Sequence, residues 1–219
     1  VLLVQEHWLS PAMLYRFNDI IGFDYFCYAF SSMALTCSAD VLRGRPFGGL
    51  AIIVKREYLK VCKCVFNSDR LVAILIESAL IANVYFPCLS KSDHKEVTLE
   101  LLGQLDNVCT SHAYDDLIVG GDINCNLDVD TWSSRTIIEF LNSHDLANCD
   151  CRWPDRSNST YHHDTLGLYS CIDYFFVSRG AVDRIVFATI LDCVFNQSDH
   201  YPISVTFRKL LTNSSNYNV

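Results

Sequence analysis

Short apolar runs separated by polar segments make up most of the chain, and most of these runs have the length of a β-strand. They predict strands at residues 1–4, 25–30, 50–54, 60–66, 71–77, 79–86, 117–119, 171–178, 184–195 and 203–207. Apolar residues at helical spacing predict three helices, one beginning at Ser10-Pro11 and two spanning 94–112 and 133–144. Many strands with few, widely spaced helices favour an α/β (α+β) sandwich, with two facing sheets and the helices outside.

The composition is that of one folded domain with a sizeable core. Half of the 219 residues are hydrophobic and 19% are charged, and no linker interrupts the chain. The longest apolar stretch, 71–86, is broken by Glu77, Ser78 and Asn83, so no segment is long enough to span a membrane. The first residues lack the pattern of a signal peptide. We therefore expect an intracellular protein, nuclear or cytoplasmic, that is not secreted and has no membrane partner.

Cysteine usage and net charge argue against two classes of protein. The 11 cysteines, an odd number scattered along the chain, do not match a small secreted disulfide framework. A net charge of −8 argues against a strongly basic nucleic-acid binder. It leaves room for an enzyme whose site gathers carboxylates around a divalent cation, because the cation reverses the local field.

Four polar islands adjoin the predicted strands, each where a strand leaves the core. They are Gln5-Glu6, Asp122-x-Asn124, Ile172-Asp173-Tyr174 and Ser198-Asp199-His200. Strand ends form a rigid platform for groups that must converge. Glu6 and Asp199 are hard oxygen ligands of the kind that Mg²⁺ takes. Asp122 can orient or deprotonate a water molecule, and Asn124 can hold a phosphate oxygen or fix the neighbouring carboxylate.

The last two islands offer an acid and an imidazole. Asp173 can accept a hydrogen bond from His200 and raise its pKa, and a charged His200 would stabilise a negative transition state. Each island alone also fits a structural role, as a solvated turn or a satisfied histidine. If the islands had only structural roles, all four of these interpretations would have to hold at once. A shared functional site is therefore the favoured interpretation.

These residues resemble the endonuclease/exonuclease/phosphatase superfamily. The matching motifs, in order, are Gln5-Glu6, Asn83-Val84-Tyr85-Phe86-Pro87, Gly121-Asp122-Ile123-Asn124, Ser159-Thr160-Tyr161, Ser170-Cys171-Ile172-Asp173-Tyr174 and Ser198-Asp199-His200-Tyr201-Pro202. The resemblance covers nearly the whole chain, from Glu6 to Phe207. It implies a DNase I-like four-layer sandwich of two mixed β-sheets, and a metal-dependent phosphoesterase that uses Mg²⁺ or Mn²⁺ for in-line attack of water on phosphorus.

The resemblance also implies a role for each matching residue. Glu6 is similar to the metal ligand, Asp199 to the carboxylate near the metal and leaving group, and Tyr85 to the tyrosine that contacts the phosphate. Asp122 resembles the water-activating aspartate, with Asn124 its neighbour, and Asp173 and His200 the paired acid and imidazole. We assign Thr160, Ser170 and Arg45, which lie in matching segments, to substrate binding.

Two segments narrow the resemblance further. Gln5-Glu6-His7-Trp8-Leu9 and Gly44-Arg45-Pro46-Phe47-Gly48-Gly49-Leu50 look like the apurinic-type endonuclease domain of non-LTR (LINE-type) retrotransposons. Such domains nick DNA to prime reverse transcription, which implies DNA as partner and a reverse transcriptase downstream in the full-length protein. Two alternatives stay open: a phosphatase or phosphodiesterase for a small or lipid substrate, and an inactive remnant or protein-binding module. The oligomeric state is not predicted.

The ends of the chain also lead to an expectation. The superfamily begins with a strand that carries an asparagine close to the metal, and this chain resembles the family only after that strand. We therefore expect an N-terminally truncated domain over residues 1–208, with its first strand missing, and a C-terminal tail over 209–219. The resemblance then implies weak or no activity for the chain as given.

Overall fold

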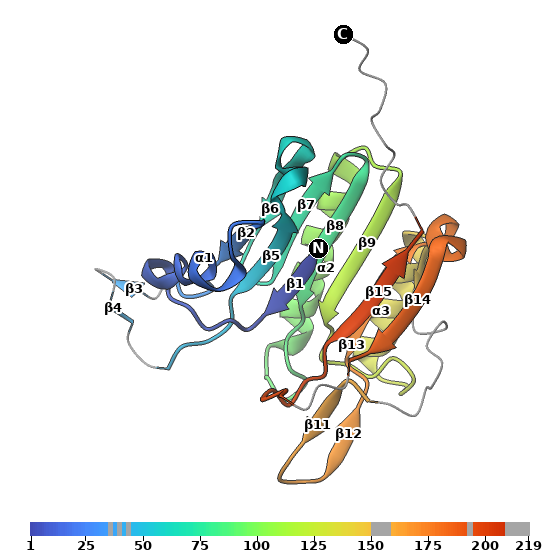
Figure 1. Ribbon diagram of the computed structural model, residues 1–219. Helices are drawn as coiled ribbons and strands as arrows, with labels where there is room; N and C mark the ends of the chain where they lie inside the picture. Colours follow the sequence, from blue (N-terminus) through green and yellow to red (C-terminus); the bar gives the residue numbers. More distant parts are fainter. Residues whose placement is uncertain (35–36, 39–40, 43–44, 150–158, 192–194, 209–219) are drawn as a thin grey trace.

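The computed structural model describes residues 1–34, 37–38, 41–42, 45–149, 159–191 and 195–208, and its layers are visible in Figure 1. The expected tail at 209–219 therefore lies outside the described residues. Within them, no helix combines the length and the hydropathy needed to cross a membrane.

A six-stranded sheet forms the centre of the molecule, in the order β10-β13-β9-β8-β7-β6. Its strands are β6 (Cys62–Asn67), β7 (Leu71–Ile76), β8 (Ala79–Tyr85), β9 (Asp116–Asp122), β10 (Leu146–Asn148) and β13 (Asp173–Ser178). β8 and β9 are parallel and the other pairs are antiparallel, so the sheet is mixed, as expected. β8 and β9 are buried along almost their whole length because both faces of this sheet are covered.

A second β-layer packs on one face of this sheet. It consists of the three-stranded sheet β1-β5-β2, formed by β1 (Leu2–Gln5), β5 (Leu50–Lys55) and β2 (Tyr25–Phe30), and of the hairpin β14 (Ile185–Ile190) and β15 (Ile203–Phe207). All pairings in this layer are antiparallel, whereas the resemblance implied a second mixed sheet. Leu50, Ile52 and Val54 point from β5 into the apolar core between the layers.

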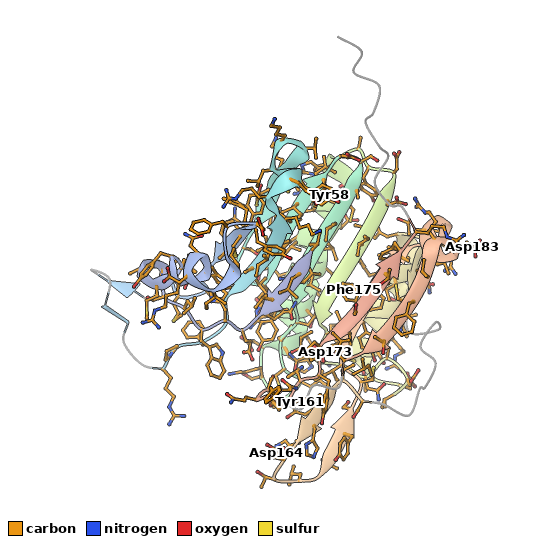
Figure 2. The ribbon with its side chains drawn as sticks, viewed as in Figure 1. Tyr58, Tyr161, Asp164, Asp173, Phe175 and Asp183 are labelled. Carbon is orange, nitrogen blue, oxygen red and sulfur yellow. The ribbon has the colours of Figure 1, made fainter. Side chains whose placement is uncertain are left out.

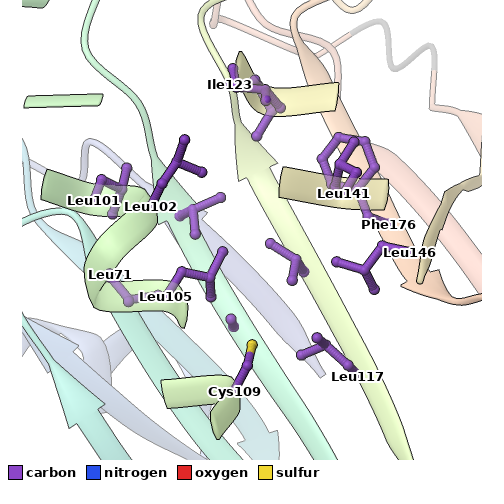
Figure 3. Packing of buried hydrophobic residues seen from close by; sticks show 14 of the residues in the cluster. Leu71, Leu101, Leu102, Leu105, Cys109, Leu117, Ile123, Leu141, Leu146 and Phe176 are labelled. Carbon is purple, nitrogen blue, oxygen red and sulfur yellow. The ribbon is translucent and has the colours of Figure 1, made fainter. Parts of the chain in front are cut away.

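Helices cover the two outer faces. α2 (His94–Ser111) and α3 (Trp132–Ser143) pack on the six-stranded sheet, and Leu101, Leu105 and Leu141 meet strand residues such as Leu117 and Phe176 there (Figure 3). α1 (Arg16–Ile21) covers β1-β5-β2 by placing Phe17 against the outward side chains of β5. The four-layer sandwich expected from the sequence is therefore confirmed.

Several elements differ from the sequence prediction. The first helix is split into a 3₁₀ turn, Pro11–Met13, and α1, and the Ser10 side chain makes no capping hydrogen bond. The strand expected at 184–195 is only 185–190, after a 3₁₀ turn over Arg179–Arg184, and 192–194 lie outside the described residues. A 3₁₀ turn, Arg56–Val61, also precedes β6. The pattern of apolar and polar residues did not predict three features: β10, the antiparallel pair formed by β3 (Cys37–Ser38) and β4 (Val41–Leu42), and the hairpin formed by β11 (Tyr161–His163) and β12 (Leu168–Ser170).

Gly121 lies within β9, where glycine is required by close packing and not by a turn. Its φ is +146°, and a Cβ at this position would clash with the carbonyl oxygen of Val84 on the neighbouring strand. We expect Gly121→Ala to lower the free energy of unfolding by about 3 kcal/mol, measured by urea denaturation. Gly103 on α2 is the matched control: its Cβ would meet nothing within 4 Å, so Gly103→Ala should raise stability by about 0.5–1 kcal/mol. A fully stable Gly121→Ala variant would contradict this packing.

Candidate active site

Three neighbouring strands of the six-stranded sheet end side by side with polar side chains. Asp122 at the end of β9 is the register partner of Tyr85 on β8 and of Asp173 on β13. Register partners point to the same face of a sheet, so these three side chains share the face that packs on the second β-layer. Because the strands fix their Cα positions, these three side chains stand on rigid backbone.

Asp122 is held by the turn that follows it. The residue is 6% exposed, and its two carboxylate oxygens accept hydrogen bonds from the backbone N–H of Asn124, at 2.8 Å, and from the Asn124 Nδ2, at 3.0 Å. Asn124 has a φ of +52°, a left-handed conformation that asparagine tolerates better than most residues. The same Nδ2 donates to the carbonyl of Phe86, at 3.0 Å, which joins the turns after β8 and β9.

His200 meets Asp173 on the other side of Asp122. The His200 Nδ1 lies 2.9 and 3.1 Å from the two carboxylate oxygens of Asp173. The hairpin β11–β12 braces this pair, because the Tyr161 ring lies 5.0 Å from the His200 ring and the backbones of the two residues form a β-bridge. Figure 2 shows Tyr161 at the base of this hairpin, next to Asp173.

Thr160 binds the backbone of the segment that carries Asp173. It is fully buried, and its Oγ1 accepts hydrogen bonds from the backbone N–H groups of Ile172 and Asp173, both at 3.0 Å. A side chain with no exposed surface has no direct access to a substrate. The geometry therefore indicates that Thr160 holds the start of β13, whereas the sequence analysis had assigned it to substrate binding.

Glu6 enters the site from the second β-layer. It follows β1 with a left-handed φ of +53°, and its Oε1 accepts a hydrogen bond of 2.6 Å from the Tyr85 hydroxyl. Asn83 fixes the end of β1: it is completely buried, and its Nδ2 donates to the carbonyls of Val4, at 2.9 Å, and Ala51, at 3.0 Å. Its Oδ1 accepts from the Gln5 side chain. Asn83 thus joins β8 to β1 immediately before Glu6.

The charges of the site act on one another. Burial and the nearby charge of Asp173 raise the pKa of Asp122 to about 7, and Glu6 adds to this rise. Burial opposes a charge on His200, but the hydrogen bond and charge of Asp173, with the charges of Asp122 and Asp199, raise the pKa of His200 to about 9. At neutral pH the site therefore holds a charged imidazolium beside a carboxyl group that is poised to lose or take a proton.

A comparison with protein-family models gives a match over residues 1–200, to the endonuclease/exonuclease/phosphatase family. The chain belongs to this family.

Solved structures agree with this family fold. A 3′ phosphatase, NExo, from Neisseria, bound to a product DNA hairpin, has a TM-score of 0.64 at 16% identity, covering 94% of this chain and 88% of that chain. An AP endonuclease from Archaeoglobus fulgidus has a TM-score of 0.63 at 16% identity, covering 94% and 87%. The endonuclease domain of TRAS1, a telomere-specific non-LTR retrotransposon, has a TM-score of 0.60 at 18% identity, covering 84% and 81%. No curated protein sequence matches the chain.

The donor set of this family member fits a hard divalent cation. Ligand atoms of Asp122, Asp173 and His200 all lie within 4.8 Å of one another. The His200 Nδ1 faces Asp173, and a raised pKa keeps the ring protonated, so His200 is a poor metal ligand. Of this group the carboxylates of Asp122 and Asp173 remain. The charge of Glu6, which lies outside the group, also reaches Asp122, and the raised pKa of Asp122 reflects an excess of negative charge that a cation would offset.

The other predicted site residues lie further out. Asp199 is exposed, and its charge contributes to the raised pKa of His200. In the described part of the chain, no hydrogen bond joins its side chain to another predicted site residue. Ser170 is half-buried on β12, where its carbonyl accepts from the N–H of Thr160, at 3.0 Å. Arg45 is exposed, and no hydrogen bond joins it to the predicted site among the residues that the structure describes.

Sequence reasoning missed the supporting role of Asn83. The signal was present, because Asn83 is a polar residue inside the apolar run 79–86. Asn83 was used to argue against a membrane span and as part of a family motif, and no role was assigned to it. A polar residue inside a buried strand must find hydrogen-bond partners and so indicates a specific contact.

Proposed function

We propose that this chain is a metal-dependent DNA endonuclease that hydrolyses phosphodiester bonds by in-line attack of water on phosphorus. The observation that carries the proposal is the buried Asp122 carboxylate, fixed by Asn124 and placed beside the Asp173–His200 pair. A phosphoester hydrolase needs a base for the attacking water and a positive group for the negative charge on the phosphate oxygens. Asp122 supplies the base, and His200, held by Asp173, supplies the positive group.

Each residue has a defined task in this proposal. Asp122, with a pKa of about 7, accepts the proton of the attacking water. Asn124 keeps the Asp122 carboxylate aligned through its two hydrogen bonds. His200, held protonated by Asp173, stabilises negative charge on the phosphate oxygens, and Thr160 holds the backbone of Asp173 in place. Tyr85 orients Glu6 through its hydroxyl group and would contact the phosphate, as the family resemblance implies.

Glu6 would hold Mg²⁺ or Mn²⁺ together with Asp199 at the rim of the site. When bound, the cation supplies Lewis-acid polarisation of the phosphate and neutralises charge on the leaving oxygen.

The assignment of DNA as substrate, and of target-DNA nicking for retrotransposition, rests on two supports. The segments around Glu6 and Arg45 resemble LINE-type endonucleases, and the TRAS1 endonuclease domain shares the fold. A reverse transcriptase in the full-length protein follows from the same proposal.

Comparing two substrate classes tests this assignment. The purified chain should convert supercoiled plasmid to nicked circles in Mg²⁺ and release no phosphate from inositol phosphates, with both reactions run at equal protein concentration. Phosphate release without nicking would instead favour a phosphatase of a small or lipid substrate. Activity on neither substrate, with no Mn²⁺ binding detected by electron paramagnetic resonance, would favour an inactive remnant.

A further inference from the structure

Arg70 lies in the turn before β7 and contacts Tyr85 in three ways. Its carbonyl accepts the backbone N–H of Tyr85 at 3.0 Å, and its Nη1 donates to the Tyr85 carbonyl at 3.1 Å. Its Cζ also lies 5.1 Å from the centroid of the Tyr85 ring, a cation–π distance. A guanidinium that contacts both the backbone and the ring of one residue restricts the orientation of that ring.

The turn that carries Arg70 is itself anchored. The Ser68 Oγ accepts the backbone N–H groups of Arg70, at 3.4 Å, and Leu71, at 3.1 Å, and donates to Gln104 of α2 at 2.9 Å. The Ser32 Oγ donates to the carbonyl of Asp69 at 3.0 Å. Arg70 therefore projects from a turn that is tied to the helical layer on one side and to the second β-layer on the other.

The hydroxyl end of Tyr85 meets Glu6, so the contacts form a chain from Arg70 through Tyr85 to Glu6. Glu6 is exposed and its own backbone is in the left-handed conformation. Tyr85 makes the side-chain hydrogen bond that orients the Glu6 carboxylate. Burial raises the pKa of Tyr85, as do Glu6 and Asp122, whereas the Arg70 charge lowers it. Arg70 is thus the positive group that balances the two carboxylates facing this phenol.

We propose that Arg70 is a positioning residue for the active site, which fixes Tyr85 and, through the Tyr85 hydroxyl, the carboxylate of Glu6. The expected changes in kcat rest on the proposed function, and the expected changes in Mn²⁺ affinity rest on Glu6 as a cation ligand. Arg70 acts through Tyr85 and does not touch the reacting atoms.

A double-mutant cycle tests this route. Because misplacing a catalytic group by a fraction of an ångström is costly, Arg70→Met should lower kcat for plasmid nicking on the order of tenfold with little change in KM. Tyr85→Phe should lower kcat at least as much. The double variant should be no slower than Tyr85→Phe within about twofold, because two residues that act through one contact are not additive. Losses that multiply in the double variant would overturn the proposal, since they would indicate an independent role.

Mn²⁺ binding provides a readout that does not depend on activity. Arg70→Met and Tyr85→Phe should each weaken Mn²⁺ binding, measured by electron paramagnetic resonance, by about the same factor of three to ten, and the double variant by no more. If the wild-type chain does not cut DNA but this pattern holds, the proposed function fails and the role of Arg70 stands. Unchanged Mn²⁺ affinity in Arg70→Met would overturn the role.

Arg56 offers a matched control for lost arginine contacts. It also donates to backbone carbonyls, to Phe23 at 2.7 Å and to Tyr25 at 3.1 Å, but it follows the end of β5 opposite the site. Arg56→Met should leave kcat and Mn²⁺ affinity unchanged. Arg70→Lys, which retains the charge and disturbs folding less, should recover only part of the loss, because an ammonium lacks the planar contact with the ring. Full recovery by lysine would contradict a geometric role.

Discussion

Replacing Asp122 by asparagine is expected to lower kcat for DNA nicking by about 10²–10⁴-fold, because the general base is lost while the shape of the side chain remains. The same variant is expected to be more stable than the wild type above neutral pH. Burial and Asp173 raise the pKa of Asp122 to about 7 in the folded state, well above the value of an unfolded aspartate. The wild-type fold therefore loses stability as pH rises toward 7, and a neutral asparagine removes that loss.

The sign of this stability change can be checked directly. Urea unfolding of both proteins, in EDTA, should show a larger advantage for Asp122→Asn at pH 8 than at pH 5, where the wild-type carboxyl group is protonated. Asp128 is the control, because it is exposed and follows the same turn; Asp128→Asn should change neither rate nor stability measurably. An Asp122→Asn variant with near wild-type activity would refute the assignment of the base.

Replacing Asp173 by asparagine is expected to shift the pH dependence of the reaction. The wild-type rate should rise as Asp122 ionises, below its metal-free pKa of about 7 because a bound cation favours the carboxylate, and fall as His200 loses its proton, with an apparent pKa of about 9. Without the Asp173 carboxylate, burial still opposes the charge on His200. The pKa of His200 should then drop by about two units, back toward 6.5, and the rate at pH 8 should fall at least tenfold.

Two measurements check this shift. The alkaline fall of the pH–rate profile of nicking should move to lower pH, and nuclear magnetic resonance titration of the His200 ring should give the lower pKa even if activity is too weak to follow. The pair of His144 and Asp106, 3.0 Å apart on the helical layer, is the matched control, and Asp106→Asn should leave the profile unchanged. An unshifted His200 titration in Asp173→Asn would contradict the role given to Asp173.

The order of layers and the polar strand ends could be predicted from the sequence because both are local patterns. Alternating and continuous apolar runs located β5, β7, β8 and β13, and the islands Asp122-x-Asn124 and Ser198-Asp199-His200 followed from their place after such runs. The resemblance to a family supplied their roles. β9 showed the limit of local reasoning: the apolar run predicted a strand over 117–119 only, whereas the strand reaches Asp122 and includes Gly121, which packs against Val84.

What the sequence did not indicate depends on long-range pairing. The contact of Arg70 with Tyr85 depends on the register of β7 and β8, and the contacts of Asn83 with Val4 and Ala51 depend on the packing of one sheet on the other. The β11–β12 hairpin is short, rich in histidine and tyrosine, and lacks strong alternation, so its pattern was not distinguishable from a loop. Thr160 fits a substrate contact by motif, and only its complete burial indicates a supporting role.

The central claim is that Asp122 and its neighbours form a metal-dependent phosphodiesterase site. The most direct measurement is nicking of supercoiled plasmid by the purified chain, in molar excess over the plasmid, with Mg²⁺ or with EDTA, beside Asp122→Asn. Nicked circles that accumulate with Mg²⁺, disappear with EDTA and are absent with the variant are the result we predict. Nicking that persists in EDTA, or that the variant performs at the wild-type rate, would contradict the claim, as would a wild-type chain that neither nicks DNA nor binds Mn²⁺.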